Sequence, residues 1–281
     1  MRVSISNIAW DVSEDEQVAR LLNKYGVDAI DVAPGKYFPD PINAYADDIV
    51  RVREWWLSRG IEIIGMQALL FGTTGLNLFG SEGSQAAMLE HLEAVCRIGS
   101  SLGATKLVFG SPRNRDCSAW PDEDVREIAI RFFRQLGGIA DRYGVEICLE
   151  PNPPCYGANF MTNSADTADI VTEVGHPSIR MQLDTGALAI NGENPEWVIK
   201  DYAALIGHVH ASEPDLVTLG DGGVNHAVIA SQLSRLLPEQ VVTIEMLLAR
   251  NESNIEAMER ALGIAVYHYR EGYSCGSEVS A

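Results

Sequence analysis

The sequence predicts an α/β fold, a single (β/α)8 TIM barrel over residues 1–271, followed by a C-terminal tail at 272–281. Two observations lead to this prediction. Short β-branched runs alternate with longer amphipathic runs, and no linker-like stretch divides the chain. Eight such pairs in 281 residues average about 35 residues each, which is the size of one strand–helix repeat.

Eight runs have the apolar character of strands that are covered on both faces. The predicted strands are 3–10, 27–33, 61–67, 105–111, 145–151, 179–185, 206–212 and 241–247. An open doubly wound sheet is the main alternative, and it usually carries a glycine-rich phosphate turn after its first strand. The first strand here continues into NIAWDVSEDE, which contains no glycine. The closed barrel is therefore favoured.

The intervening helices have recognisable ends. Ser13 and Glu16 have the spacing of a capping box, and Gly26 can stop the helix that follows them. A second helix is predicted over 123–143, and Ser164 is expected to cap a third. Each of these helices would separate two predicted strands, as a parallel barrel requires.

The composition excludes several classes of partner. The chain has 39 acidic and 21 basic residues, for a formal net charge of −18, and such a surface repels nucleic-acid phosphates and anionic lipids. No run approaches the roughly 18–20 apolar residues of a membrane span. Its five cysteines are an odd number without a CxxC pair, which is typical of reduced thiols. We therefore expect a cytoplasmic protein that binds neither nucleic acid nor membrane.

The C-terminal ends of the strands in a TIM barrel converge on one pocket, so their polar residues are candidates for a site. These residues are Asn7, Trp10, Asp31, Gln67, Ser111, Arg113, Glu150, Asp184, His208, His210 and Glu245. Four of them, Glu150, Asp184, His210 and Glu245, stand at or near the last position of four successive apolar runs. A single strand-end carboxylate is often a helix cap or a surface charge, but chance rarely gives four such residues at one register.

Three carboxylates in one pocket predict a bound cation. Without one, each buried charge would cost several kcal/mol. Three carboxylate oxygens and one imidazole nitrogen suit one divalent ion such as Mn²⁺, Mg²⁺ or Co²⁺, and we favour Mn²⁺. Structural zinc would prefer thiolates, and no cysteine stands at these four strand ends.

Five further residues on this face are candidate substrate contacts: Gln67, Arg113, His208, His226 and Trp10. Arg113 follows the fourth strand in a cationic loop, where it could bind a carboxylate, a phosphate or sugar hydroxyls, or anchor the loop through a salt bridge. His208 lies two residues before His210 and so faces the same side of its strand. His226 heads a helix after a glycine turn. Trp10 could stack on a sugar ring or pack in the core.

The segments LEPN (149–152), LDTG (183–186), GHVHASE (207–213) and TIEM (243–246) resemble the xylose-isomerase-like TIM-barrel superfamily. This resemblance covers about residues 1–271. The superfamily includes sugar phosphate isomerases and epimerases, ketose 3-epimerases, hydroxypyruvate isomerase, inosose dehydratase and endonuclease IV. The resemblance implies that Glu150, Asp184, His210 and Glu245 hold a metal. It also implies that Glu150 and Glu245 are the catalytic acid–base pair.

Several positions depart from particular members of the superfamily. Ala187, Leu216 and Tyr156 stand where ketose 3-epimerases carry a histidine, an arginine and a glutamate that face the substrate. Gln67 and Ser111 stand where endonuclease IV needs histidines for its additional metals. The metal-binding pattern is therefore intact, while the substrate-facing pattern of a ketose 3-epimerase is missing.

These observations predict a divalent-metal-dependent isomerase or epimerase of a sugar or keto-sugar, working through an enediolate with Glu150 and Glu245. A first alternative is a metal-dependent lyase on a keto-sugar or keto-polyol. It would be a dehydratase or would cleave a 3-keto-glycoside, including a C-glycoside. A second alternative is a non-catalytic barrel subunit of a partner enzyme. The expected ligand is a small sugar or keto-sugar, and either a homo-oligomer or a hetero-subunit is compatible with the sequence.

Overall fold

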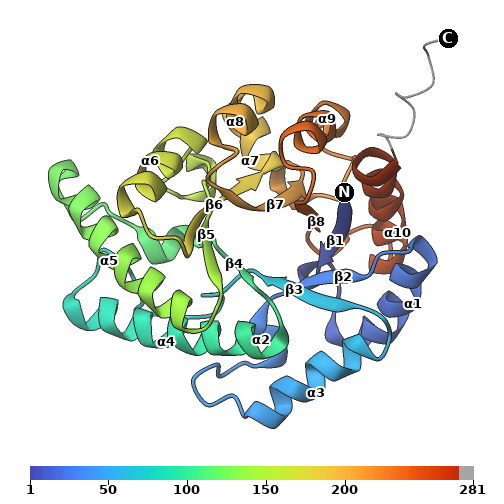
Figure 1. Cartoon of the computed structure of the whole chain (residues 1–281), viewed down its shortest axis with the longest axis horizontal. Coiled ribbons are helices and arrows are strands. Elements are labelled where there is room, and N and C mark those ends of the chain that lie inside the picture. The colour runs from blue at the N-terminus through green and yellow to red at the C-terminus, as the bar shows by residue number, and fades with distance from the viewer. Residues whose placement is uncertain (272–281) are drawn as a thin grey trace.

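The computed structural model describes residues 1–271 and has eight parallel strands that close into one barrel in chain order (Figure 1). The strands are β1 (Arg2–Ser6), β2 (Ala29–Val32), β3 (Glu62–Met66), β4 (Lys106–Phe109), β5 (Glu146–Leu149), β6 (Ile179–Asp184), β7 (Ile206–Ser212) and β8 (Val241–Glu245). The predicted TIM barrel is confirmed, and each strand lies within its predicted run except at the first residue of β1. The tail predicted at 272–281 lies outside the described residues.

Helices cover the outside of the barrel (Figure 1). They are α1 (Asp15–Tyr25), α2 (Pro34–Tyr37), α3 (Ala46–Leu57), α4 (Glu82–Leu102), α5 (Asp122–Arg142), α6 (Ser164–Val174), α7 (Thr185–Asn191), α8 (Pro195–Tyr202), α9 (His226–Leu236) and α10 (Asn254–Ala265). The short helices α2 and α7 are additions to the eight strand–helix pairs. Within residues 1–271, no helix combines the length and the apolar character that crossing a membrane requires.

Two predicted helix caps are wrong by one or two residues. The capping box before α1 is formed by Asp11 and Glu14, because the chain makes a 3-10 turn there before the helix begins. Helix α6 is capped by Asn163, whose side chain accepts a hydrogen bond from the amide of Asp166. Gly26 does end α1 in the left-handed conformation, as predicted.

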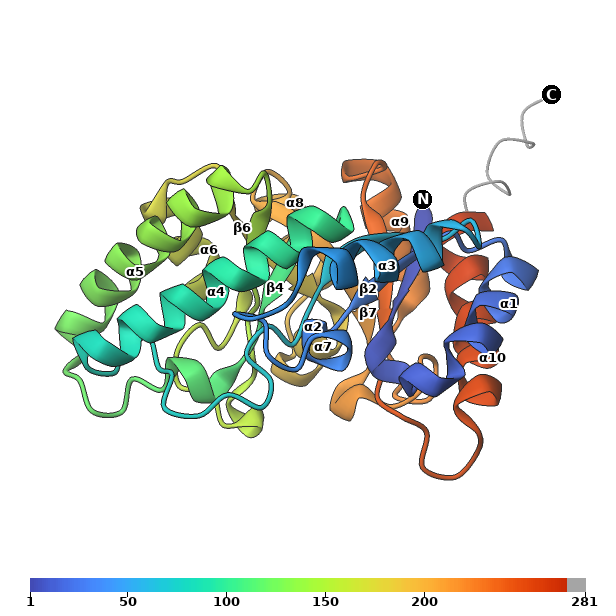
Figure 2. The ribbon, with the colours of Figure 1, turned by 90° about the horizontal axis from the view of Figure 1, so that it is seen from below.

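The register of the sheet places the strand ends of the second half side by side. Asp184 of β6 pairs with His210 of β7, and Ser212 of β7 pairs with Glu245 of β8. Because all strands are parallel, the loops that follow them gather at one end of the barrel. In Figure 2 these loops lie along the lower edge of the molecule, whereas the N-terminus lies along the upper edge. One end of the barrel therefore carries all eight strand ends.

Helix α5 packs closely on the barrel through one glycine of an adjacent pair. A Cβ atom at Gly137 would lie 2.6 Å from Cγ of His176 and 3.1 Å from Cγ1 of Ile179. A Cβ atom at Gly138 would meet no atom within 4 Å. Two neighbouring glycines in one helix therefore differ in whether they can accept a side chain.

This difference gives a matched pair of variants. Gly138→Ala should stabilise the protein by about 0.5–1 kcal/mol, because alanine is the better helix former. Gly137→Ala should destabilise it by about 1–3 kcal/mol, because the new methyl group overpacks against His176. Urea unfolding followed by circular dichroism measures both free energies of unfolding. Equal effects of the two substitutions would contradict this view of the α5 packing.

Candidate metal centre

The structure brings together the four side chains that were predicted as metal ligands. Glu150 follows β5, Asp184 ends β6, His210 lies in β7 and Glu245 ends β8. One ligand atom from each lies within 4.8 Å of the other three. Nδ1 of His210 is 3.2 Å from Oε2 of Glu245 and 3.6 Å from Oε1 of Glu150. The cluster sits at the carboxyl ends of four consecutive strands.

The electrostatics of this cluster favour an added positive charge. Burial, together with the carboxylates of Glu245 and Glu150, raises the pKa of Asp184 to about 8. Burial alone would lower the pKa of His210, but the surrounding carboxylates outweigh it and raise that pKa well above its ordinary value. At neutral pH the cluster therefore holds protons on both groups to limit the repulsion among its carboxylates.

The donor set fits a divalent cation. A bound cation would supply the positive charge that the two protons supply in its absence. Carboxylate oxygens and one imidazole nitrogen are ligands that Mn²⁺, Mg²⁺ and Co²⁺ accept, and no thiolate belongs to the cluster. Glu150, Asp184, His210 and Glu245 would be its ligands.

Two amide side chains hold the two glutamates. Nε2 of Gln67 donates a hydrogen bond to Oε1 of Glu245 at 2.7 Å, and Nδ2 of Asn152 donates to Oε2 of Glu150 at 3.0 Å. The amide oxygens, Oε1 of Gln67 and Oδ1 of Asn152, are buried and find no hydrogen-bond partner in the described part of the chain. A buried acceptor without a donor costs about 1–3 kcal/mol, so these two oxygens favour a ligand that carries hydroxyl groups. Gln67 was predicted in this position, whereas Asn152 was not.

A glycine makes room for one of the glutamates. A Cβ atom at Gly110, which follows β4, would lie 1.9 Å from Oε2 of Glu150. No side chain larger than hydrogen therefore fits there without moving the carboxylate. Gly110 was not among the predicted site residues, because its role depends on a neighbouring strand that lies 40 residues further along the chain.

The cationic loop after β4 turns Arg115 inward, whereas Arg113 was the predicted contact. Arg113 is exposed, whereas Arg115 is fully buried and its Nη1 donates a hydrogen bond to the carbonyl oxygen of Glu150 at 2.7 Å. Nε and Nη2 of Arg115 make no hydrogen bond to any residue that the structure describes. The sequence PRNR offers two arginines, and only the turn of the loop decides which one faces inward. A substrate contact by Arg113 stays a prediction, and Arg115 holds the backbone beside Glu150.

Two other predicted substrate contacts, Trp10 and His226, are buried and hydrogen-bonded to other side chains. Trp10 is 0% exposed and its Nε1 donates to Oδ1 of Asp15 at 2.7 Å, so the ring belongs to the core and offers no free face for stacking. His226 uses both ring nitrogens, Nδ1 with the hydroxyl of Tyr269 at 2.6 Å and Nε2 with Oε1 of Glu213 at 3.1 Å. The structure therefore corrects both expectations to packing and loop-holding roles.

His208 lies inside the barrel beside a carboxylate to which no role was given. Its Nε2 is 2.9 Å from Oδ2 of Asp31, which ranks among the fully buried residues. Burial would raise the pKa of Asp31, but His208 and His210 outweigh it and lower that pKa to about 2. The interior of the barrel therefore holds a permanent negative charge next to two histidines.

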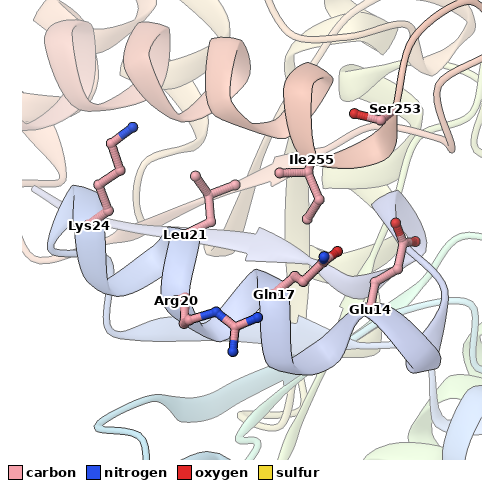
Figure 3. Close-up of a pocket in the computed structure, with 7 residues that line it drawn as sticks. All are labelled: Glu14, Gln17, Arg20, Leu21, Lys24, Ser253 and Ile255. Atoms are coloured by element: carbon pink, nitrogen blue, oxygen red, sulfur yellow. The ribbon is translucent and has the colours of Figure 1, made fainter.

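A groove on the outside of the barrel is separate from this cluster. It lies between α1 and the start of α10, and its lining includes Gln17, Leu21 and Ile255 (Figure 3). These residues belong to covering helices rather than to strand ends. The groove is therefore no part of the metal centre.

Comparisons with known proteins agree with the fold. A family model described as a xylose isomerase-like TIM barrel matches residues 19–263. The chain is 25% identical over 126 residues to D-psicose 3-epimerase of Ruminiclostridium cellulolyticum, and this match spans 42% of each chain. That region is less than half the length of the relative, so the similarity does not extend over the whole of that protein.

Two solved structures are also similar. The structure of an L-ribulose 3-epimerase has a TM-score of 0.80 at 18% identity, with 100% of this chain and 99% of the other covered. The structure of a 3-keto-D-glucoside 4-epimerase from E. coli has a TM-score of 0.78 at 17% identity, with 94% and 98% covered. At these identities the two structures establish the fold alone.

Replacing the glycine beside Glu150 tests the geometry of the cluster. Gly110→Ala should displace the Glu150 carboxylate and weaken Mn²⁺ binding by about 10-fold or more, because one ligand leaves its place. Isothermal titration calorimetry measures the affinity. Gly35→Ala is the control, because a Cβ atom there meets nothing within 4 Å. Equal affinity of both variants would show that Glu150 is not held where the structure places it.

The protonated groups of the cluster predict that metal binding depends on pH. Protons on Asp184 and His210 compete with a cation, so affinity should rise as the pH increases from about 6 to above the Asp184 pKa of about 8. Titration with Mn²⁺ at pH 7 in two buffers of different ionisation enthalpy should show net proton release. Binding without proton release would contradict the protonation states inferred here.

Proposed function

We propose, from the premise that the chain belongs to the xylose isomerase-like TIM-barrel family, that it is a divalent-metal-dependent isomerase or epimerase of a sugar or keto-sugar. The observation that carries the proposal is the cluster of Glu150, Asp184, His210 and Glu245 at one end of the barrel. Similarity to proteins named as sugar epimerases supports the same class of reaction. A cytoplasmic location, predicted from the composition, belongs to this proposal.

The two glutamates would be the acid–base pair. Inverting a carbon next to a carbonyl requires a base at one face of that carbon and an acid at the other. Glu150 and Glu245 come from strands that two other strands separate, so they reach the cluster from different sides. One would remove the proton to give an enediolate, and the other would return a proton. The hydrogen bonds from Asn152 and Gln67 would orient the two carboxylates.

The bound cation, for which Mn²⁺ is our choice, would polarise the carbonyl and hydroxyl oxygens of the substrate. Its ligands would include both glutamates, so the acid–base groups and the reacting carbon would lie close together. The partner-free amide oxygens of Gln67 and Asn152 would each accept a hydrogen bond from a substrate hydroxyl. A polyhydroxylated carbon chain has the donors that these oxygens lack.

A metal-dependent lyase acting on a keto-sugar is the second candidate. The departure from the ketose 3-epimerase pattern at Tyr156 favours it; the hydroxyl of this residue accepts a hydrogen bond from the amide of Asp215 at 2.7 Å. This tyrosine links two loops at a position where a ketose 3-epimerase would carry a glutamate. The same enediolate could then expel a neighbouring substituent instead of being reprotonated. A non-catalytic subunit is disfavoured, because the acid–base pair and its supporting amides are all present.

Deuterium exchange tests the proposed chemistry. Loaded with Mn²⁺ in D₂O, the protein should exchange the hydrogen next to the carbonyl of at least one member of a panel of free ketoses and 3-keto-glucosides. Glu150→Gln and Glu245→Gln should each slow this exchange by about 10²–10⁴-fold, because each removes one proton-transfer group. NMR follows the exchange.

The control for these variants is Glu239→Gln, an exposed glutamate outside the cluster. Interconversion of epimers with exchange supports the isomerase or epimerase. Release of water or an aglycone without interconversion supports the lyase. Full exchange by both glutamine variants would overturn the acid–base assignment.

A further inference from the structure

His210 is approached by negative charge from two sides. Its Nδ1 faces the metal cluster, 3.2 Å from Oε2 of Glu245. Its Nε2 faces the barrel interior, 3.8 Å from Oδ2 of Asp31. Asp31 lies on β2, two strands away from β8 around the barrel, and is 0% exposed. The Asp31 carboxylate therefore faces the ring nitrogen of His210 that points away from the metal cluster.

The neighbouring strand is shaped to accept this carboxylate. Asp31 pairs with Gly65 of β3, and a Cβ atom at Gly65 would lie 2.5 Å from Oδ1 of Asp31. Any larger residue at position 65 would therefore push the carboxylate away from the histidines. The absence of a side chain at Gly65 leaves the space that the Asp31 carboxylate occupies.

The hydrogen bonds of this group are incomplete. Among residues 1–271, both carboxylate oxygens of Asp31 and Nε2 of His210 are buried without a well-formed hydrogen bond. Nε2 of His208 lies on one side of Asp31, 2.9 Å from its Oδ2. A buried carboxylate with so few partners is costly, so its presence is not explained by stability alone. Besides His208, the ring nitrogen that faces this carboxylate is Nε2 of His210, at 3.8 Å from Oδ2.

We infer that Asp31 is a positioning residue for the metal centre, which fixes His210 as the tautomer with hydrogen on Nε2 and so leaves the Nδ1 lone pair for the cation. A histidine that binds a metal commonly donates its other ring N–H to a carboxylate, which sets its orientation and raises its basicity. Closing the Asp31–His210 distance by roughly 0.7 Å would complete that hydrogen bond. His208 would hold the other side of the carboxylate. The inference rests on the proposed metal-dependent function.

Metal affinity tests this role without reference to any substrate. Asp31→Asn should bind Mn²⁺ about 10–100-fold more weakly than the unchanged chain, because the carboxylate behind the ligand is lost. Gly65→Ala should weaken binding in the same direction, because it displaces the same carboxylate. Asp28→Asn, at an exposed aspartate that pairs with Arg2, is the matched control and should leave the affinity unchanged. Isothermal titration calorimetry gives the affinity and the stoichiometry.

A spectroscopic readout on the unchanged protein keeps the inference testable if a variant does not fold. With Mg²⁺ bound, ¹H–¹⁵N correlation spectra of the histidine rings should show His210 with hydrogen on Nε2 and none on Nδ1. Hydrogen on Nδ1, an unchanged affinity in folded Asp31→Asn, or a second Mn²⁺ per chain that uses Asp31 as a ligand would each overturn the inference. A protein that binds no divalent ion would overturn the proposed function as well, whereas loss of the Asp31 effect alone would leave it standing.

Discussion

The repulsion among three carboxylates at one end of the barrel is the constraint on which the site depends. Glu150, Asp184 and Glu245 come from different strands and converge on His210, so their charges cannot all be neutralised by solvent. Raised pKa values of Asp184 and His210 favour protons on both groups, and the same repulsion would favour a bound cation. Gln67 and Asn152 hold two of these carboxylates by hydrogen bonds, Gly110 leaves room for one of them, and Arg115 holds the backbone carbonyl of Glu150.

Much of this arrangement could be predicted from the sequence. Eight alternating repeats define a closed barrel, and a barrel brings its strand ends together whatever their distance along the chain. Polar residues at the ends of apolar strands are therefore candidates for one site. The structure brings the four predicted ligands together. Gln67 was recognised for the same reason. The sequence shows which residue ends each strand, so site residues at strand ends can be predicted from it.

Residues that act from loops, or only through their neighbours, were not accessible. Arg113 and Arg115 are two residues apart in one loop, and only its turn directs Arg115 inward. Trp10 is a candidate substrate contact in the sequence, but in the structure its ring is buried in the core. Gly110 and Gly65 matter because of side chains on adjacent strands, which a single sequence does not reveal. The caps differ from the prediction because a 3-10 turn precedes α1 and because Asn163, one residue before Ser164, accepts the hydrogen bond at the start of α6.

The central claim is that Glu150, Asp184, His210 and Glu245 together bind one divalent ion that the reaction needs. Metal analysis of the purified protein, combined with activity before and after dialysis against a chelator, tests it most directly. The account predicts about one divalent ion per chain, loss of activity on its removal and recovery when Mn²⁺ is added back. A folded, fully active protein free of divalent metal would contradict it.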